Sequence, residues 1–201
     1  IFLINIYDFL ISLYYQKHKF KIMLSINDTQ LVILDIQGKL SQIVYQSEAV
    51  LKHSSSLVQG CQLLDIPIIW VEQTPEKLGA TSALIAQLLT GQSPIAKATF
   101  SAYGTSAFVE AVKANARKQV LLIGIETHIC IYQTAMDLIA AGYEVFVVAD
   151  AVSSRTEENK KIGLEMIREG QGKITSVEAT LFALLKSSTH EKFREIARLI
   201  K

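Results

Sequence analysis

The sequence contains few cysteines, namely Cys61 and Cys130 among its 201 residues. Neither lies in a CxxC pair or in a Cys/His cluster, so a disulfide framework and a structural zinc site are both disfavoured. Reduced thiols are typical of a reducing compartment. We therefore expect a cytoplasmic protein, in which a lone thiol could also serve in a reaction.

Excess charge of either sign is also absent, because 20 Lys and Arg residues oppose 19 Asp and Glu residues. Proteins that bind a phosphate backbone usually carry a basic surplus. The near balance thus predicts no nucleic-acid partner. Half of the residues are apolar, which at this length suits one globular domain with a sizeable core.

No apolar run is long enough for a comfortable membrane span. The first 21 residues, IFLINIYDFLISLYYQKHKFK, begin with an apolar part that Asp8 interrupts. This part precedes the basic residues, the reverse of the order in a secretory signal. Two readings stay open: the natural protein starts at Met23, with residues 1–22 as an extension, or this segment contacts a membrane. We expect a single domain over residues 23–201, with no membrane partner of its own.

Three common catalytic and nucleotide-binding signatures are missing as well. No GxSxG nucleophile elbow, phosphate-binding loop or GxGxxG turn follows a predicted strand. A serine hydrolase of the elbow type and a dinucleotide-binding protein are therefore disfavoured.

From Gln30 onward, short apolar runs rich in β-branched residues alternate with longer amphipathic segments. Strands this apolar are covered on both faces, and their alternation with helices indicates parallel crossover connections. The sequence predicts a doubly wound, three-layer α/β/α sandwich with a mostly parallel sheet of about six strands. The expected strands are 31–36, 67–73, 94–100, 119–125, 143–151 and 173–176, and the expected helices are 44–65, 82–89, 104–117, 127–142, 156–170 and 177–185.

Ligands of such sheets bind outside the carboxyl ends of the strands. This rule selects Asp35, Lys97 and Cys130, which lie at or after three predicted strands. Each also has a simpler reading: Asp35 could cap a loop, Lys97 could be solvated on an edge strand, and Cys130 could be a small buried apolar residue. Together, a carboxylate base, a thiol nucleophile and a cation would suit acyl transfer or hydrolysis.

Cys130 is expected in the first turn of a helix. The positive end of the helix dipole and the exposed N–H groups favour a thiolate there. We therefore expect the pKa of Cys130 to lie below the ordinary value of a cysteine. Cys61, within a helix and on an apolar stripe, is expected to be part of the core.

The stretches LVILDIQ, IAKATFSAYG and LLIGIETHICIYQTAMDLIAAGYEVFVVADAVSSR together resemble the isochorismatase-like cysteine hydrolase family, across residues 28–186. The segment is most similar to the small, mostly uncharacterised isochorismatase-domain hydrolases. The resemblance implies a catalytic triad in which Asp35 is the general base, Lys97 its charged partner and Cys130 the nucleophile. It also implies an oxyanion hole of backbone N–H groups near Ile129 and a cis peptide bond between Ile125 and Glu126.

The substrate is expected to be a small molecule. Family members of the nicotinamidase type bind a metal through an Asp and several His after the second strand, whereas EQTPEKLGAT in this chain has no His. We expect no metal and no cofactor, and Glu126 should disfavour anionic ligands unless it is paired with Arg155 or Lys97. The residues expected around the substrate are Gln37, Trp70, Gln73, Phe100, Tyr103 and Ile129.

The predicted activity is the cleavage of an amide or related C–N bond through a thioester on Cys130. The alternative is a binding or scaffold protein that retains the fold with little or no activity, because a fold does not guarantee chemistry. The resemblance also implies a homo-oligomer.

Overall fold

Six strands form one sheet in the order β3-β2-β1-β4-β5-β6 in a computed structural model that describes residues 23–201. Every neighbouring pair is parallel. Residues 1–22, on which the two readings of the N-terminal segment depend, lie outside the described residues. The strands are β1 (Thr29–Leu34), β2 (Ile68–Gln73), β3 (Ile95–Lys97), β4 (Gln119–Ile125), β5 (Glu144–Ser153) and β6 (Lys173–Thr175).

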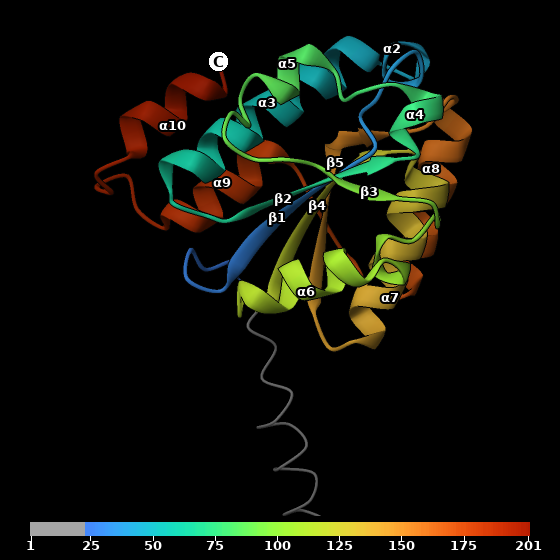
Figure 1. Cartoon of the computed structure of the whole chain (residues 1–201). Coiled ribbons are helices and arrows are strands. Elements are labelled where there is room, and N and C mark those ends of the chain that lie inside the picture. The colour runs from blue at the N-terminus through green and yellow to red at the C-terminus, as the bar shows by residue number, and fades with distance from the viewer. Residues whose placement is uncertain (1–22) are drawn as a thin grey trace, which may run out of the picture.

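Helices cover both faces of the sheet, as Figure 1 shows. One face carries α3 (Ser47–Leu63), α5 (Ala83–Ala86), α9 (Val177–Leu185) and α10 (Phe193–Leu199). The other face carries α6 (Ser106–Ala114), α7 (Tyr132–Ala140) and α8 (Glu157–Glu169). The predicted doubly wound parallel α/β sandwich is confirmed.

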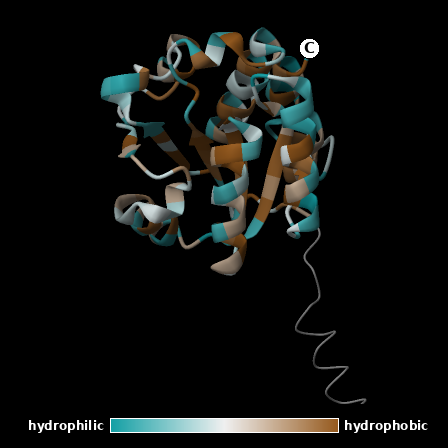
Figure 2. Ribbon diagram, turned by 90° about the vertical axis from the view of Figure 1, so that its right-hand side faces the viewer, coloured by the Kyte–Doolittle hydropathy of each residue, from teal (hydrophilic) through white to brown (hydrophobic). Residues whose placement is uncertain are grey.

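The alternation of side chains along each strand divides the core into two layers. In β1, Leu31 and Ile33 pack under α3 and α9, whereas Val32 and Leu34 pack under α6, α7 and α8. All four side chains are fully buried. Figure 2 shows the apolar strands enclosed between helices of mixed polarity. None of the helices among residues 23–201 is long and apolar enough to cross a membrane.

Three one- or two-turn helices are absent from the sequence prediction. They are α2 (Leu40–Ile43), α4 (Pro75–Leu78) and α10 (Phe193–Leu199). The first two span four residues each, which is too short to show a helical period. Both lie at the same end of the sheet in Figure 1, just after β1 and β2.

The segment predicted as one helix over 127–142 is divided in two. A π-helical turn, η2 (Thr127–Ile131), precedes α7, which ends at Ala140. Gly142 has a φ of +84°, the left-handed backbone expected just after the end of a helix. Cys130 therefore lies in a π-helical turn and not in the first turn of an α-helix.

The strand order places a switch point between β1 and β4, because the chain runs outward from this pair in both directions. Crevices for ligands form at such points, outside the carboxyl ends of the two strands. Asp35 follows β1 directly, and Glu126 follows β4 directly. The fold thus brings both residues to the mouth of one crevice.

Candidate active site

Asp35, Lys97 and Cys130 meet at the carboxyl edge of the sheet. Lys97 is the last residue of β3, and Cys130 lies in η2. Lys97 Nζ is 2.8 Å from Asp35 Oδ2, and the Cys130 thiol lies near enough to both groups for their charges to shift its pKa. All three residues are buried. The simpler readings of a solvated Lys97 and of an Asp35 that only caps a loop do not fit this geometry.

The Lys97 ammonium is fully buried, so its charge must be compensated inside the protein. It donates hydrogen bonds to Gln73 Oε1 at 2.5 Å, to the carbonyl of Phe100 at 3.1 Å and to the carbonyl of Thr99 at 3.2 Å. With the Asp35 carboxylate, four oxygens surround the cation. Such a set of partners offsets the cost of removing an ammonium from water.

Gln37 and Gln73, both expected to contact the substrate, use their side-chain amides inside the protein. Gln37 Oε1 accepts from the Gln73 amide at 2.7 Å, and its Nε2 donates to the carbonyls of Gln73 and Gly79 at 3.1 and 2.7 Å. Gln73 Nε2 donates to the carbonyl of Ala98 at 2.8 Å. The two glutamines thus hold the end of β2 and the position of Lys97.

Asp35 is held in an unusual backbone conformation. Its φ is +58°, in the left-handed region that only a small share of residues other than glycine adopt. Its amide donates to the carbonyl of Val71 at 3.1 Å, and its carbonyl accepts from the amide of Gln37 at 2.8 Å. The chain therefore turns sharply at Asp35, and backbone strain of this kind clusters at functional sites.

Burial raises the pKa of the Asp35 carboxyl group above its usual value, and the nearby Lys97 charge and the hydrogen bonds oppose this shift without cancelling it. Burial, reinforced by the negative charge of Asp35, raises the pKa of Cys130 to about 12, although Lys97 acts in the opposite direction. The expectation of a lowered Cys130 pKa is therefore wrong for the free protein. The helix dipole is outweighed because the thiol is desolvated beside a carboxylate, and the resting form is the thiol.

A pocket of about 120 Å³ opens beside these residues. Phe100, Ile125, Glu126 and Ile129 line it, as do Gln37 and Gln73. Leu40 of α2 and Leu78 of α4 complete the lining. The sequence reasoning missed these two leucines. Their place just after β1 and β2, where ligand sites form, was the available signal.

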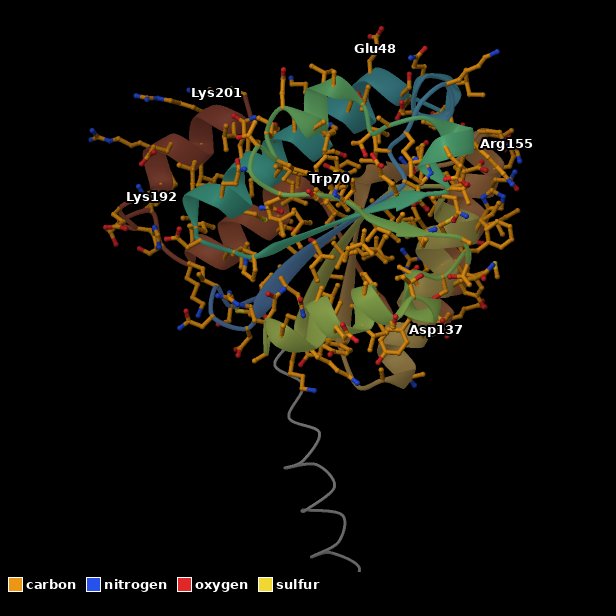
Figure 3. All side chains as sticks on the ribbon, in the orientation of Figure 1. Glu48, Trp70, Asp137, Arg155, Lys192 and Lys201 are labelled. Atoms are coloured by element: carbon orange, nitrogen blue, oxygen red, sulfur yellow. The ribbon has the colours of Figure 1, made fainter. Side chains whose placement is uncertain are left out.

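Trp70 and Tyr103 were expected at the pocket but do not line it. Trp70 Nε1 donates to Thr81 Oγ1 at 2.8 Å, and its ring packs against the core layer under α3. Tyr103 packs against the core layer under α6 and α7. Both aromatic side chains therefore belong to the framework around the site, and Figure 3 shows Trp70 over the middle of the sheet.

Glu126 forms one wall of the pocket. Its Oε1 accepts hydrogen bonds from the amide and the Nε of Arg155, at 3.0 and 3.1 Å. The peptide bond that joins Ile125 to Glu126 is cis, at the position that the family resemblance implied. Of the two partners considered for Glu126 in the sequence, Arg155 forms the ion pair, whereas Lys97 pairs with Asp35.

Several backbone amides around Cys130 already donate hydrogen bonds within the protein, which bears on whether they can stabilise an oxyanion. The amides of Ile129 and Ile131 donate to the carbonyl of Glu126 at 3.1 and 3.2 Å. The amide of Thr127 donates to Ser154 Oγ at 3.1 Å, and His128 Nδ1 lies 3.0 Å from the same oxygen. His128 therefore helps to hold the turn. Ile129 uses its amide within the turn, so its expected role as an oxyanion donor does not fit.

The described residues include no group of three or more His, Cys, Asp or Glu side chains placed to hold a metal ion. The site is instead a buried Cys, Asp and Lys at the switch point of a parallel α/β sheet. A thiol, a carboxylate and a cation grouped in this way beside a pocket make a candidate active site.

The profile of the family described as Isochorismatase domain matches residues 29–179. The chain belongs to this family of hydrolases, which confirms the resemblance seen in the sequence. It is 36% identical over 177 residues to the secreted isochorismatase effector Isc1 of Phytophthora sojae, covering 85% of this chain and 83% of that protein.

Two solved structures share the fold. The MAR1 ribonuclease of Caenorhabditis elegans is 31% identical, with a TM-score of 0.82 over 89% of this chain and 92% of that chain. The YcaC gene product of Escherichia coli, described as an octameric hydrolase of unknown specificity, is 21% identical. Its TM-score is 0.85 over 90% of this chain and 91% of that chain.

Proposed function

We propose that the protein is a metal-independent cysteine hydrolase that cleaves an amide or related C–N bond of a small molecule. The observation that carries the proposal is the convergence of the Cys130 thiol, the Asp35 carboxylate and the Lys97 ammonium beside one small pocket. Nucleophilic catalysis by a thiol requires a base next to it, and Asp35 is that base.

The reaction begins when Asp35 removes the Cys130 proton as the sulfur attacks the substrate carbonyl. Because the pKa of the thiol is raised to about 12, proton removal accompanies the attack and does not precede it. Collapse of the tetrahedral intermediate breaks the C–N bond, and protonated Asp35 gives its proton to the departing nitrogen. Water, activated by Asp35, then hydrolyses the thioester and restores the thiol.

The amide of Glu126 supports the tetrahedral oxyanion in this scheme. Glu126 lines the pocket together with Cys130, which places its backbone near the site of attack. A positioned N–H donor of this kind contributes about 3 kcal/mol to a transition state. Lys97 lowers the pKa of Asp35 and so favours its ionised form, in opposition to burial.

Two relatives suggest other substrates by name: one is called an isochorismatase and another a ribonuclease. Isochorismate and RNA are both anionic. Asp35 and Glu126 line the pocket in this chain, and their cationic partners Lys97 and Arg155 lie outside the lining, so an anion in the pocket would find no cation to pair with. A small neutral amide fits this lining better.

The proposal extends to the setting of the enzyme. We place it in the cytoplasm because both cysteines are free, and we propose a homo-oligomer, following the octameric description of YcaC. Light scattering of the purified protein tests the second point, and a mass equal to one chain would contradict it.

Hydrolysis of a panel of small primary amides and ureides tests the activity, with release of ammonia as the readout. We expect turnover by the wild type and by Cys61→Ala, and none by Cys130→Ala. Hydroxylamine added during turnover should trap the acyl group as a hydroxamate. Turnover that survives in Cys130→Ala would refute the thioester route. A wild type without turnover, whose Cys130 also resists alkylating reagents, would favour the binding or scaffold alternative.

A further inference from the structure

The charges that face the pocket are unbalanced. Asp35 and Glu126 line it, while neither Lys97 nor Arg155 does. Lys97 is wholly buried behind Asp35. The Arg155 side chain is 58% exposed, and Figure 3 shows it at the periphery of the molecule. Both oxygens of Asp35 are buried, so the carboxylate that a ligand in the pocket can meet is that of Glu126, and no cation lines the pocket beside it.

The two oxygens of Glu126 are in different situations. Oε1 is occupied by two donors of Arg155. Oε2 has no hydrogen-bond partner among the described residues. It is not fully buried, because the fully buried polar atoms without a partner do not include it. Glu126 as a whole is only 7% exposed. Because Glu126 lines the pocket, we infer that this accessible oxygen faces the ligand.

We propose that Glu126 determines substrate specificity by accepting a hydrogen bond from an N–H group of the substrate through Oε2, so that the substrate class is a small amide, ureide or amine-bearing amide with an apolar remainder. This inference rests on the proposed hydrolase function. The apolar remainder is accommodated by Leu40, Leu78 and Phe100.

The physical basis is the cost of leaving a buried polar group without a partner. A carboxylate oxygen without a donor, such as Glu126 Oε2, loses its hydration when a ligand excludes water from the pocket, and it gains no hydrogen bond in return. A substrate N–H supplies the missing donor. A substrate carboxylate in the same place adds like-charge repulsion in a medium less polar than water. The same residue thus selects amides and rejects acids of the same shape.

Iodoacetamide and iodoacetate provide a matched pair of probes that need no knowledge of the natural substrate. Each alkylates Cys130 by forming a C–S bond and releasing iodide, and they differ only in an amide against a carboxylate. The rates of Cys130 modification are followed by mass spectrometry of its peptide at a single pH. Their ratio does not depend on the fraction of thiolate, because both reagents meet the same thiol. The intrinsic ratio is measured on the same cysteine in the urea-unfolded chain.

We expect the folded wild type to prefer iodoacetamide by about tenfold beyond the intrinsic ratio, because the Glu126 charge is only partly offset by the largely exposed Arg155 side chain. In Glu126→Gln the ratio should return towards the intrinsic value. The matched control is Arg155→Gln, which breaks the same ion pair but leaves the Glu126 carboxylate in place. There the preference should persist or increase.

A second measurement uses only the wild-type protein. Propionamide should protect Cys130 from iodoacetamide at concentrations at which propionate does not. A ratio in the folded protein equal to the intrinsic ratio, or equal protection by both ligands, would overturn the role of Glu126 while leaving the thiol accessible and the hydrolase proposal intact. Failure of both reagents to reach Cys130 would overturn the specificity proposal together with the proposed function.

Discussion

The protein buries two thiols in surroundings that differ sharply. Cys61 lies in α3, is wholly inaccessible and packs in the core layer against α9. Cys130 lies in η2, is 8% exposed and faces Asp35 and a pocket. Burial raises the pKa of both thiols. For Cys61 burial is the sole cause, whereas for Cys130 the charges of Asp35 and Lys97 act as well.

The comparison shows that a raised thiol pKa does not by itself separate a structural cysteine from a nucleophile. What separates them is a base within reach of the proton and an opening through which a ligand arrives. Cys61 packs in an apolar core layer, and no ionisable neighbour contributes to the shift of its pKa. Cys130 has both a nearby base, Asp35, and a pocket beside it. Because its pKa is raised, proton transfer to Asp35 is part of the attack.

The largest effect is expected from removing each thiol in turn. Cys130→Ala should abolish hydrolysis and alkylation at the site, because no other nucleophile lines the pocket. Cys61→Ala should retain both, and its cost should fall on the free energy of unfolding, by about 1–2 kcal/mol for a small cavity. Amide hydrolysis and urea unfolding of the two variants separate these roles. Loss of activity in Cys61→Ala with unchanged stability would contradict the purely structural role of Cys61.

Next in size are the changes that remove the charges beside Cys130. Asp35→Asn should slow hydrolysis by about a hundredfold or more, the usual worth of a general base. The same change should lower the pKa of Cys130, because the Asp35 charge raises it. Lys97→Gln should raise that pKa, and it should also raise the pKa of Asp35 further, because Lys97 lowers it.

The sign of these shifts can be read from pH profiles. The alkylation profile of Cys130 should move to lower pH in Asp35→Asn and to higher pH in Lys97→Gln. The acid limb of hydrolysis, where protonated Asp35 cannot act as a base, should move to higher pH in Lys97→Gln. Circular dichroism checks that both variants fold, since a buried ion pair that loses one member costs about 3–5 kcal/mol. Profiles that shift in the same direction in both variants would contradict the arrangement.

The smallest effect is expected from two glycines that each lie beside one of the cysteine regions. A Cβ at Gly163 of α8 would lie 2.7 Å from the backbone nitrogen of His128, so η2 must move. A Cβ at Gly60 would lie 2.5 Å from Cδ2 of Leu181, a side chain that can shift. Both alanine variants should lose about 1–3 kcal/mol of stability through overpacking.

Only Gly163→Ala should also slow the reaction at Cys130, by several-fold, because it displaces the turn that carries the thiol. Thermal unfolding and the alkylation rate, measured on both variants, distinguish stability from positioning. An equal slowing in Gly60→Ala would show that the two regions are coupled through the sheet.

Much of the fold could be predicted from the sequence because its signals are local. The segments 119–125 and 68–73 contain apolar runs rich in β-branched residues, and each segment coincides with an observed strand. The short α2 and α4 could not be predicted, since four residues carry no period and their helical turns depend on contacts such as that between the amide of Gly38 and the carbonyl of Ala80. The structural role of the Gln37 side chain likewise depends on its hydrogen bond to the carbonyl of Gly79, 42 positions away.

The sequence by itself determined the parallel sheet and the identities of Asp35, Lys97 and Cys130 as candidates, because strand periodicity and motifs are written in neighbouring residues. The tertiary structure alone decided that the Cys130 thiol is protonated at rest, that Trp70 and Tyr103 lie away from the pocket, and that Glu126 turns one oxygen to Arg155. Burial and charge pairing arise between residues distant in the chain, so their balance exists only once the chain has folded.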